Sequence, residues 1–239
     1  MFLNIISFLT VFFTSFYSSM IGLIPGIQTI NQSNSQISYE QQTESQEPEP
    51  RIIYYTEIVD LETVVYNQLG GNIYSSSGCG PTCAAMLLSS ETDTYISKDK
   101  AVITAYDNNY YYDAGVNLTS GQGVTQENIQ DLFKIFGYES QIDHLWNNSD
   151  NEIIEKINDK ISYGHRLIVG HCTTNGSLHY AVIYGKYLCE DVYYYKIADP
   201  WQGVTYEWNQ YSLLNHLNTA NGNDDTTFNG LVKGIQWLV

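Results

Sequence analysis

Basic side chains are scarce in this sequence: Lys and Arg number 10 against 26 Asp and Glu, for a formal net charge of −16. A chain with so few cations cannot neutralise the phosphates of a nucleic acid. The composition therefore excludes nucleic acid as a partner.

Metal-ligand spacings are also missing. The chain has 4 Cys and 5 His, but none of them forms a CxxC or HxxxH pattern. Structural zinc sites are built on such closely spaced ligands. We therefore predict no metal, and the chemistry inferred below needs no cofactor.

What is present is enough apolar surface for a core. Of the 239 residues, 43% are hydrophobic and 14% are aromatic, which is too much for a mostly disordered protein. Two full domains would be crowded at this length, and no internal repeat is visible. The sequence predicts one sizeable folded domain with appendages.

The N-terminal segment differs from the rest of the chain. Residues 1–24 are apolar and carry no charged side chain, with a hydrophobic stretch from Phe8 to Phe16. Such a stretch is typical of an export signal, although no Lys or Arg precedes Arg51 and no clear cleavage site follows. We interpret it as a signal peptide of a secreted or extracytoplasmic protein. The alternative is an uncleaved membrane anchor, because about 20 apolar residues can cross a bilayer.

A polar segment separates this stretch from the globular sequence. Residues 25–51 are mostly Asn, Gln, Ser and Glu and end in EPEP, with almost nothing to bury. This composition is typical of a linker, and a short pro-segment is the alternative. The predicted domain is 52–239.

Helical patterns dominate the first part of that domain. Pro81 suits the first turn of a helix that begins after Gly78, and Thr125 and Ser149 are caps of two more. Gly137 and Gly164 mark the ends of these two helices.

Strand patterns dominate the second part. The segments 167–174, 177–188 and 192–199 are rich in Val, Ile and Tyr, and Asn175-Gly176 is a strong turn signal. They predict an antiparallel meander, completed by strands at 205–208 and 233–239 and a short helix at 211–217. Helices followed by antiparallel strands predict an α+β fold.

Cys79 is the first candidate for chemistry. The macrodipole and free N–H groups of a helix N-terminus stabilise a thiolate there. Gly78 and Gly80 would leave a bare backbone for a substrate carbonyl, and the Cys79 N–H could donate to an oxyanion. The alternative is a buried or disulfide-bonded cysteine.

His179 is the best base for such a nucleophile, because it lies in an otherwise apolar strand. His171, at the far end of the preceding strand, is its competitor. A hairpin centred near residue 190 would place His179 opposite residue 201, two positions from Asp199, so this carboxylate could fix the imidazole tautomer. Asp199-Pro200 could equally end a strand with an Asx turn, and both roles are compatible. The other histidines are predicted on the surface or on the late helix: His144, His165 and His216.

These residues carry a resemblance. The segments GCGPTCAAMLLS, LHYAVIYG and YYYKIADPWQG, in that order, resemble the papain-fold cysteine peptidases related to the bacteriocin-leader-processing peptidases, family thirty-nine of the cysteine peptidases. The match spans about Val64 to Trp208. It implies a papain-like fold with Cys79 as nucleophile, His179 as base and Asp199 as its orienting acid. It further implies Gln68, in VVYNQLGG, as oxyanion donor.

The resemblance implies a peptidase that hydrolyses peptide bonds in a peptide or protein substrate through Cys-His acyl transfer. No transporter cassette or multi-span segment is present, so the substrate need not be a double-glycine leader. Two alternatives stay open: a transglutaminase-like acyl-transfer enzyme, and a secreted binding module with an inactive triad. Contact with a membrane is expected only through an uncleaved N-terminal segment. The sequence does not give the oligomeric state.

Three cysteines remain. Cys83 lies one helical turn after Cys79 and is expected in the core, because a disulfide within a helix turn has poor geometry. Cys172 and Cys189 could pair if their strands adjoin, which the sequence leaves open.

Overall fold

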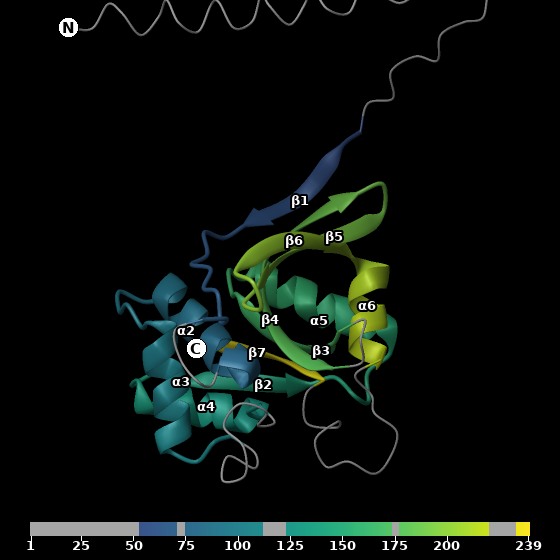
Figure 1. Cartoon of the computed structure of the whole chain (residues 1–239). Helices are drawn as coiled ribbons and strands as arrows, with labels where there is room; N and C mark the ends of the chain where they lie inside the picture. The colour runs from purple at the N-terminus through teal and green to yellow at the C-terminus, as the bar shows by residue number, and fades with distance from the viewer. Residues whose placement is uncertain (1–52, 71–74, 112–122, 174–176, 220–232) are drawn as a thin grey trace, which may run out of the picture. The chain divides into compact units, whose positions relative to one another are not determined.

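The computed structural model describes residues 53–70, 75–111, 123–173, 177–219 and 233–239, all within the unit Arg51–Val239 (Figure 1). The predicted signal peptide or anchor (1–24) and linker (25–51) lie outside the described residues, as does the Asn175-Gly176 turn. Within the described ranges, no helix is both long enough and apolar enough to span a bilayer.

Three helices form where the sequence predicts them. They are α2 (Cys79–Glu91), α4 (Gln126–Ile135) and α5 (Asp150–Ser162). Thr125 and Ser149 each close a capping box at the start of α4 and α5. Gly137 and Gly164 follow their ends with φ of 88° and 89°, the left-handed conformation that terminates a helix.

The remaining helical elements are shorter or weaker in pattern. They are the 3-10 turn η1 (Ser75–Ser77), α3 (Lys98–Asp107) and α6 (Gln210–Thr219). Helix α3 was not predicted, because it buries mainly small side chains such as Ala101 and Ala105 and so shows only a faint apolar stripe. Helix α6 covers the predicted segment 211–217 and extends slightly beyond it.

A seven-stranded antiparallel sheet forms the centre of the fold. Its strands are β1 (Tyr55–Asp60), β2 (Ser140–His144), β3 (Leu167–Cys172), β4 (Leu178–Cys189), β5 (Val192–Asp199), β6 (Val204–Asn209) and β7 (Gly234–Leu238). The order is β2-β7-β3-β4-β5-β6, with β1 paired to β4. The meander β3 to β6 and the α+β class are confirmed, whereas β1 and β2 were not predicted.

Helices cover both faces of this sheet (Figure 1). Tyr180 and Val182 of β4 pack in one core with α2, α3 and α4. Ala181 and Ile183 pack in a second core with α5 and α6. Successive strand residues point to opposite faces, so a strand between two cores is apolar throughout and shows no alternation.

Strand β4 has a β-bulge between Ile183 and Gly185, which reverses the alternation of its side chains between the two faces of the sheet. A side chain at position 185 would meet the Val59 carbonyl oxygen of β1 at 2.7 Å, so glycine permits the close pairing of the two strands. Beyond the bulge Lys186 lies opposite Tyr195, and both are buried.

Candidate active site

Cys79 is the first residue of α2, and its side chain is buried. The preceding residue is Gly78, which has no side chain to cap the helix. The N–H groups of the first turn are therefore not neutralised by a cap, and the positive end of the helix dipole faces the thiol.

Gly80 has a different role from the one expected. A Cβ at this position would lie 2.5 Å from Val124 Cγ2, 3.1 Å from Ile129 Cδ1 and 3.3 Å from Tyr180 Cδ2. The missing side chain therefore lets α2 pack closely on α4 and β4, rather than clearing a path for substrate. This packing fixes the position of Cys79 against the sheet.

His179 and Asp199 come together across the β4–β5 hairpin. The pairs Val182–Ala198 and Ile183–Ile197 set a register which, continued along the strands, puts His179 opposite residue 201. The His179 Nε2 atom lies 2.7 Å from Asp199 Oδ1, within hydrogen-bond distance. The register near the site is thus the one that the hairpin centre predicts.

The Asp199 carboxylate also organises the turn that follows it. Its Oδ1 accepts a hydrogen bond from the Trp201 N–H at 2.8 Å, as in an Asx turn. Its Oδ2 accepts from the Tyr206 hydroxyl of β6 at 3.0 Å. Both roles considered for Asp199, turn residue and histidine partner, therefore hold together. Tyr206 was not found from the sequence, because its position depends on the β5–β6 register.

The electrostatics favour a thiolate beside an imidazolium. Burial opposes the charge of Cys79 and by itself would raise the thiol pKa. The pKa is nevertheless lowered overall, by the hydrogen bond with His179, by the His179 charge and by the backbone N–H groups of Tyr180 and Gly80. Burial likewise opposes the charge of His179, but the hydrogen bonds with Asp199 and Cys79 raise its pKa.

Asp199 shows the complementary shift. Burial would raise the pKa of its carboxyl, but His179, the Trp201 N–H and the Tyr206 hydroxyl lower it overall. A proton is therefore held on the imidazole, between two groups that each favour their anionic form.

Gln68 is buried beside the same turn. The Gln68 backbone N–H donates to the Pro200 carbonyl at 2.7 Å, and the Gln68 carbonyl accepts a hydrogen bond from Lys98 Nζ at 3.2 Å. Gly203 makes this approach possible, because a Cβ there would lie 3.0 Å from Asn67 Cβ. The chain segment that carries Gln68 is therefore fixed against the Asp199 turn.

Comparisons with known proteins add little to this geometry. A scan against protein-family models and a search of curated proteins found no match. Among solved structures, the chain is similar to the crystal structure of the Pseudomonas avirulence protein AvrPphB, with 13% identity and a TM-score of 0.34 over 70% of this chain and 93% of that chain.

His171 lies directly opposite His179 in the β3–β4 pair. Its ring packs edge-on against three others, with centroid distances of 5.4 Å to His179, 5.0 Å to Trp208 and 5.6 Å to His216. Burial, and next the charge of His179, lower the pKa of His171 to about 3, so the ring is neutral. In the sequence, a hairpin centred on Asn175 places residue 171 opposite residue 179, so the turn signal alone could have predicted that the two histidines are neighbours.

The other cysteines are free thiols. Cys83 is buried in the core, as predicted. Cys172 pairs with Leu178 at one end of β4, whereas Cys189 lies at the opposite end of that strand. The strands do adjoin, but their length separates these two sulfurs and excludes the disulfide that the sequence left open. No cluster of three His, Cys, Asp or Glu side chains suited to a metal occurs in the described part of the chain.

Proposed function

We propose that this protein is a papain-like cysteine peptidase, in which Cys79 is the nucleophile, His179 the general acid and base, and Asp199 the orienting acid. The observation that carries the proposal is that His179, whose Nε2 atom lies 2.7 Å from Asp199 Oδ1, also interacts with the Cys79 thiol and lowers its pKa. A helix N-terminus and an adjacent imidazole combine at a single cysteine, which is the arrangement that activates a thiol against the cost of its burial.

In the first half of the reaction, the Cys79 thiolate attacks the carbonyl carbon of a peptide bond. The resulting oxyanion is stabilised by the Cys79 N–H and, in this proposal, by the Gln68 side-chain amide. The His179 imidazolium then gives its proton to the leaving amine as the C–N bond breaks. A thioester between Cys79 and the acyl half of the substrate remains.

In the second half, His179 takes a proton from water, whose oxygen attacks the thioester. The C–S bond breaks, a carboxylic acid leaves, and the thiolate and imidazolium are restored. Asp199 stays ionised throughout and holds the His179 ring in place, so that the other ring nitrogen faces the thiol.

Alkylation as a function of pH tests the proposal. At about pH 6, below the ordinary thiol value near 8.5, iodoacetamide should label Cys79 before the other cysteines, and activity on a mixed peptide library should disappear in step. Burial raises the pKa of Cys83 and Cys172, so both should react slowly. Cys189 is more exposed than Cys79 and serves as the internal control for access. Peptide mapping by mass spectrometry identifies the labelled residue.

Two variants complete the test. His179→Ala should move Cys79 labelling to higher pH, and Cys79→Ser should abolish cleavage with the fold intact. Labelling of Cys79 only near pH 8.5 would overturn the proposal in favour of a binding module. Normal labelling with transfer of the acyl group to an added amine, but without hydrolysis, would indicate the transglutaminase-like alternative.

A further inference from the structure

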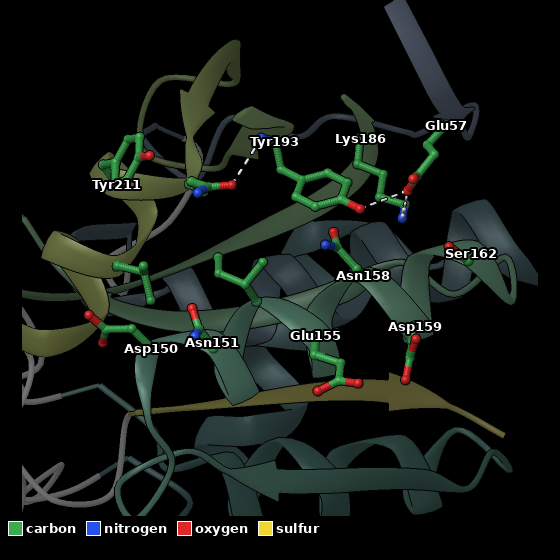
Figure 2. A pocket seen from close by; sticks show the side chains of 13 residues that line it. Glu57, Asp150, Asn151, Glu155, Asn158, Asp159, Ser162, Lys186, Tyr193 and Tyr211 are labelled. Atoms are coloured by element: carbon green, nitrogen blue, oxygen red, sulfur yellow. Dashed lines mark hydrogen bonds and ion pairs between the residues drawn. The ribbon is translucent and has the colours of Figure 1, made fainter. Parts of the chain in front are cut away.

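A cavity of about 510 Å³ lies between α5, α6 and the β4–β5 hairpin, and none of its lining residues is Gln68, Cys79, His179 or Asp199 (Figure 2). Along β4, Lys186 of the cavity is seven residues from His179, or roughly 20 Å at the rise of a strand. The cavity is therefore a separate feature of the fold.

Two β-bulges point charged side chains into this cavity. The bulge at Ile183–Gly185 turns Lys186 toward α5, and a second bulge at Thr56–Val59 of β1 contains Glu57, whose φ is 50°. Glu57 lies 3.6 Å from Lys186 Nζ and accepts a hydrogen bond from the Tyr193 hydroxyl at 2.8 Å. Bulges that re-aim side chains are frequent next to functional sites.

Hydrogen-bond donors line the inner wall of the cavity. Lys186 is only 3% exposed, and in the described part of the chain its ammonium has the Glu57 ion pair but no acceptor at hydrogen-bond distance. Asn158 is 8% exposed; its Oδ1 accepts from the Tyr195 hydroxyl, while its amide nitrogen has no acceptor among the described residues. Both residues line the cavity, and a ligand that brings acceptor oxygens can pair with these two donors.

The outer wall has the opposite character. Glu155 and Asp159 lie one turn apart on α5, and neither has a Lys, Arg or His within ion-pair distance among the described residues. Like charges at this spacing destabilise a helix. The lining as a whole has four carboxylates and one ammonium, so it attracts a cation.

Apolar surface joins the two walls. Ile154, Leu214 and the rings of Tyr193 and Tyr211 also line the cavity, and Tyr211 is 62% exposed. Aliphatic stems of Lys and Arg pack well on such surfaces, and their cationic groups are attracted to aromatic faces. Figure 2 shows Asn158 between the Glu155–Asp159 side of α5 and the Tyr193–Lys186–Glu57 side.

We propose that this cavity binds a peptide segment that carries a Lys or Arg side chain. The cationic group lies between Glu155 and Asp159, its stem packs on Tyr211 and Ile154, and main-chain carbonyl oxygens accept from Asn158 and Lys186. This assignment does not depend on the peptidase proposal, because binding requires no chemistry at Cys79.

Fluorescence anisotropy with the labelled peptide Gly-Arg-Gly-Arg-Gly tests it, on the full chain with Cys79→Ser so that cleavage cannot intervene. The same peptide with Glu in place of Arg should not bind. Glu155→Gln with Asp159→Asn should weaken binding about tenfold, which corresponds to loss of one charge-assisted hydrogen bond. Asp93→Asn with Asp107→Asn makes the same charge change on exposed residues elsewhere and should leave affinity within about twofold.

Two further variants separate a built site from general attraction to an acidic protein. Tyr211→Ala changes no charge and should weaken binding about threefold through lost stem packing. Asn158→Asp keeps the acceptor for Tyr195 but removes the amide donor, so it should weaken binding although it adds negative charge. The proposal would be overturned if the double variant of Glu155 and Asp159 and the control double variant of Asp93 and Asp107 lost the same affinity. It would also be overturned if Asn158→Asp bound the Arg peptide more tightly, or if the Glu peptide bound as well as the Arg peptide. Thermal unfolding of each variant verifies that it is folded.

Discussion

Replacement of Asp199 by Asn removes one charge while preserving most of the local geometry. The amide oxygen can keep the contacts that Oδ1 makes with His179 and the Trp201 N–H, both below 3 Å. The amide nitrogen then takes the place of Oδ2, and the Tyr206 hydroxyl can rotate to accept from it instead of donating. The main loss is therefore the attraction between Asp199 and the His179 imidazolium.

The size of that loss follows from Coulomb's law. Two unit charges about 4 Å apart interact by about 4 kcal/mol at an effective dielectric constant of about 20. The Asp199 side chain is 15% exposed, so solvent screens the pair only in part. A loss of about 2 to 4 kcal/mol lowers the equilibrium constant for formation of the thiolate–imidazolium pair about 30- to 1000-fold. Without Asp199 the pKa of His179 falls and that of Cys79 rises.

The assay measures the rate of Cys79 alkylation and of peptide cleavage from about pH 5 to 9, a range that spans the ordinary His and Cys values. In Asp199→Asn the labelling profile should move to higher pH, and cleavage at neutral pH should fall by the factor above or more. Chemical unfolding should show a loss smaller than this electrostatic loss, because the hydrogen bonds persist and the proton can return from His179 to Cys79. An unchanged labelling profile in a folded variant would refute the reasoning and leave Asp199 as a turn residue.

Three other substitutions test neighbouring parts of the site. Gln68→Ala should lower kcat about a hundredfold with little change in KM, a cost of roughly 3 kcal/mol; a change in KM alone would make Gln68 a binding or packing residue. Gly80→Ala should cost about 1 to 3 kcal/mol in urea unfolding, because the new Cβ meets Val124 Cγ2 at 2.5 Å; unchanged stability would contradict the packing role. His171→Asn should flatten the acid side of the stability profile. The wild-type ring titrates near pH 3 when folded, so the unfolded chain binds the proton first and stability falls by about 1.4 kcal/mol per pH unit as pH drops from about 6 toward 3. Equal slopes in both proteins would show that His171 does not contribute.

Local signals in the sequence determined the helices that bear on the site. Pro81 after Gly78 gives the start of α2 at Cys79, and the caps Thr125 and Ser149 give α4 and α5. A cap or a stop residue acts within one turn of chain, so its effect is readable without the rest of the fold. The β4–β5 register near the site is not local in this sense, because the bulge between Ile183 and Gly185 shifts the register that the turn sets.

Tertiary packing decided the strand pairings that no local sequence pattern predicts. Strand β2 pairs with β7 across nearly a hundred residues of sequence, and β1 pairs with the far half of β4, so neither partner is visible from its neighbours in the chain. The attachment of Gln68 to Pro200 likewise joins segments that are far apart in the sequence.

The role of individual side chains also changes with packing. Gly80 looked like a substrate opening from the sequence, but Val124 and Ile129 occupy the space beside it. Lys186 would be expected on a solvent face, yet a single bulge turns it inward against Tyr193. The physical reason is the two-residue period of a strand: one inserted residue exchanges the two faces, and only the paired structure shows where that insertion falls.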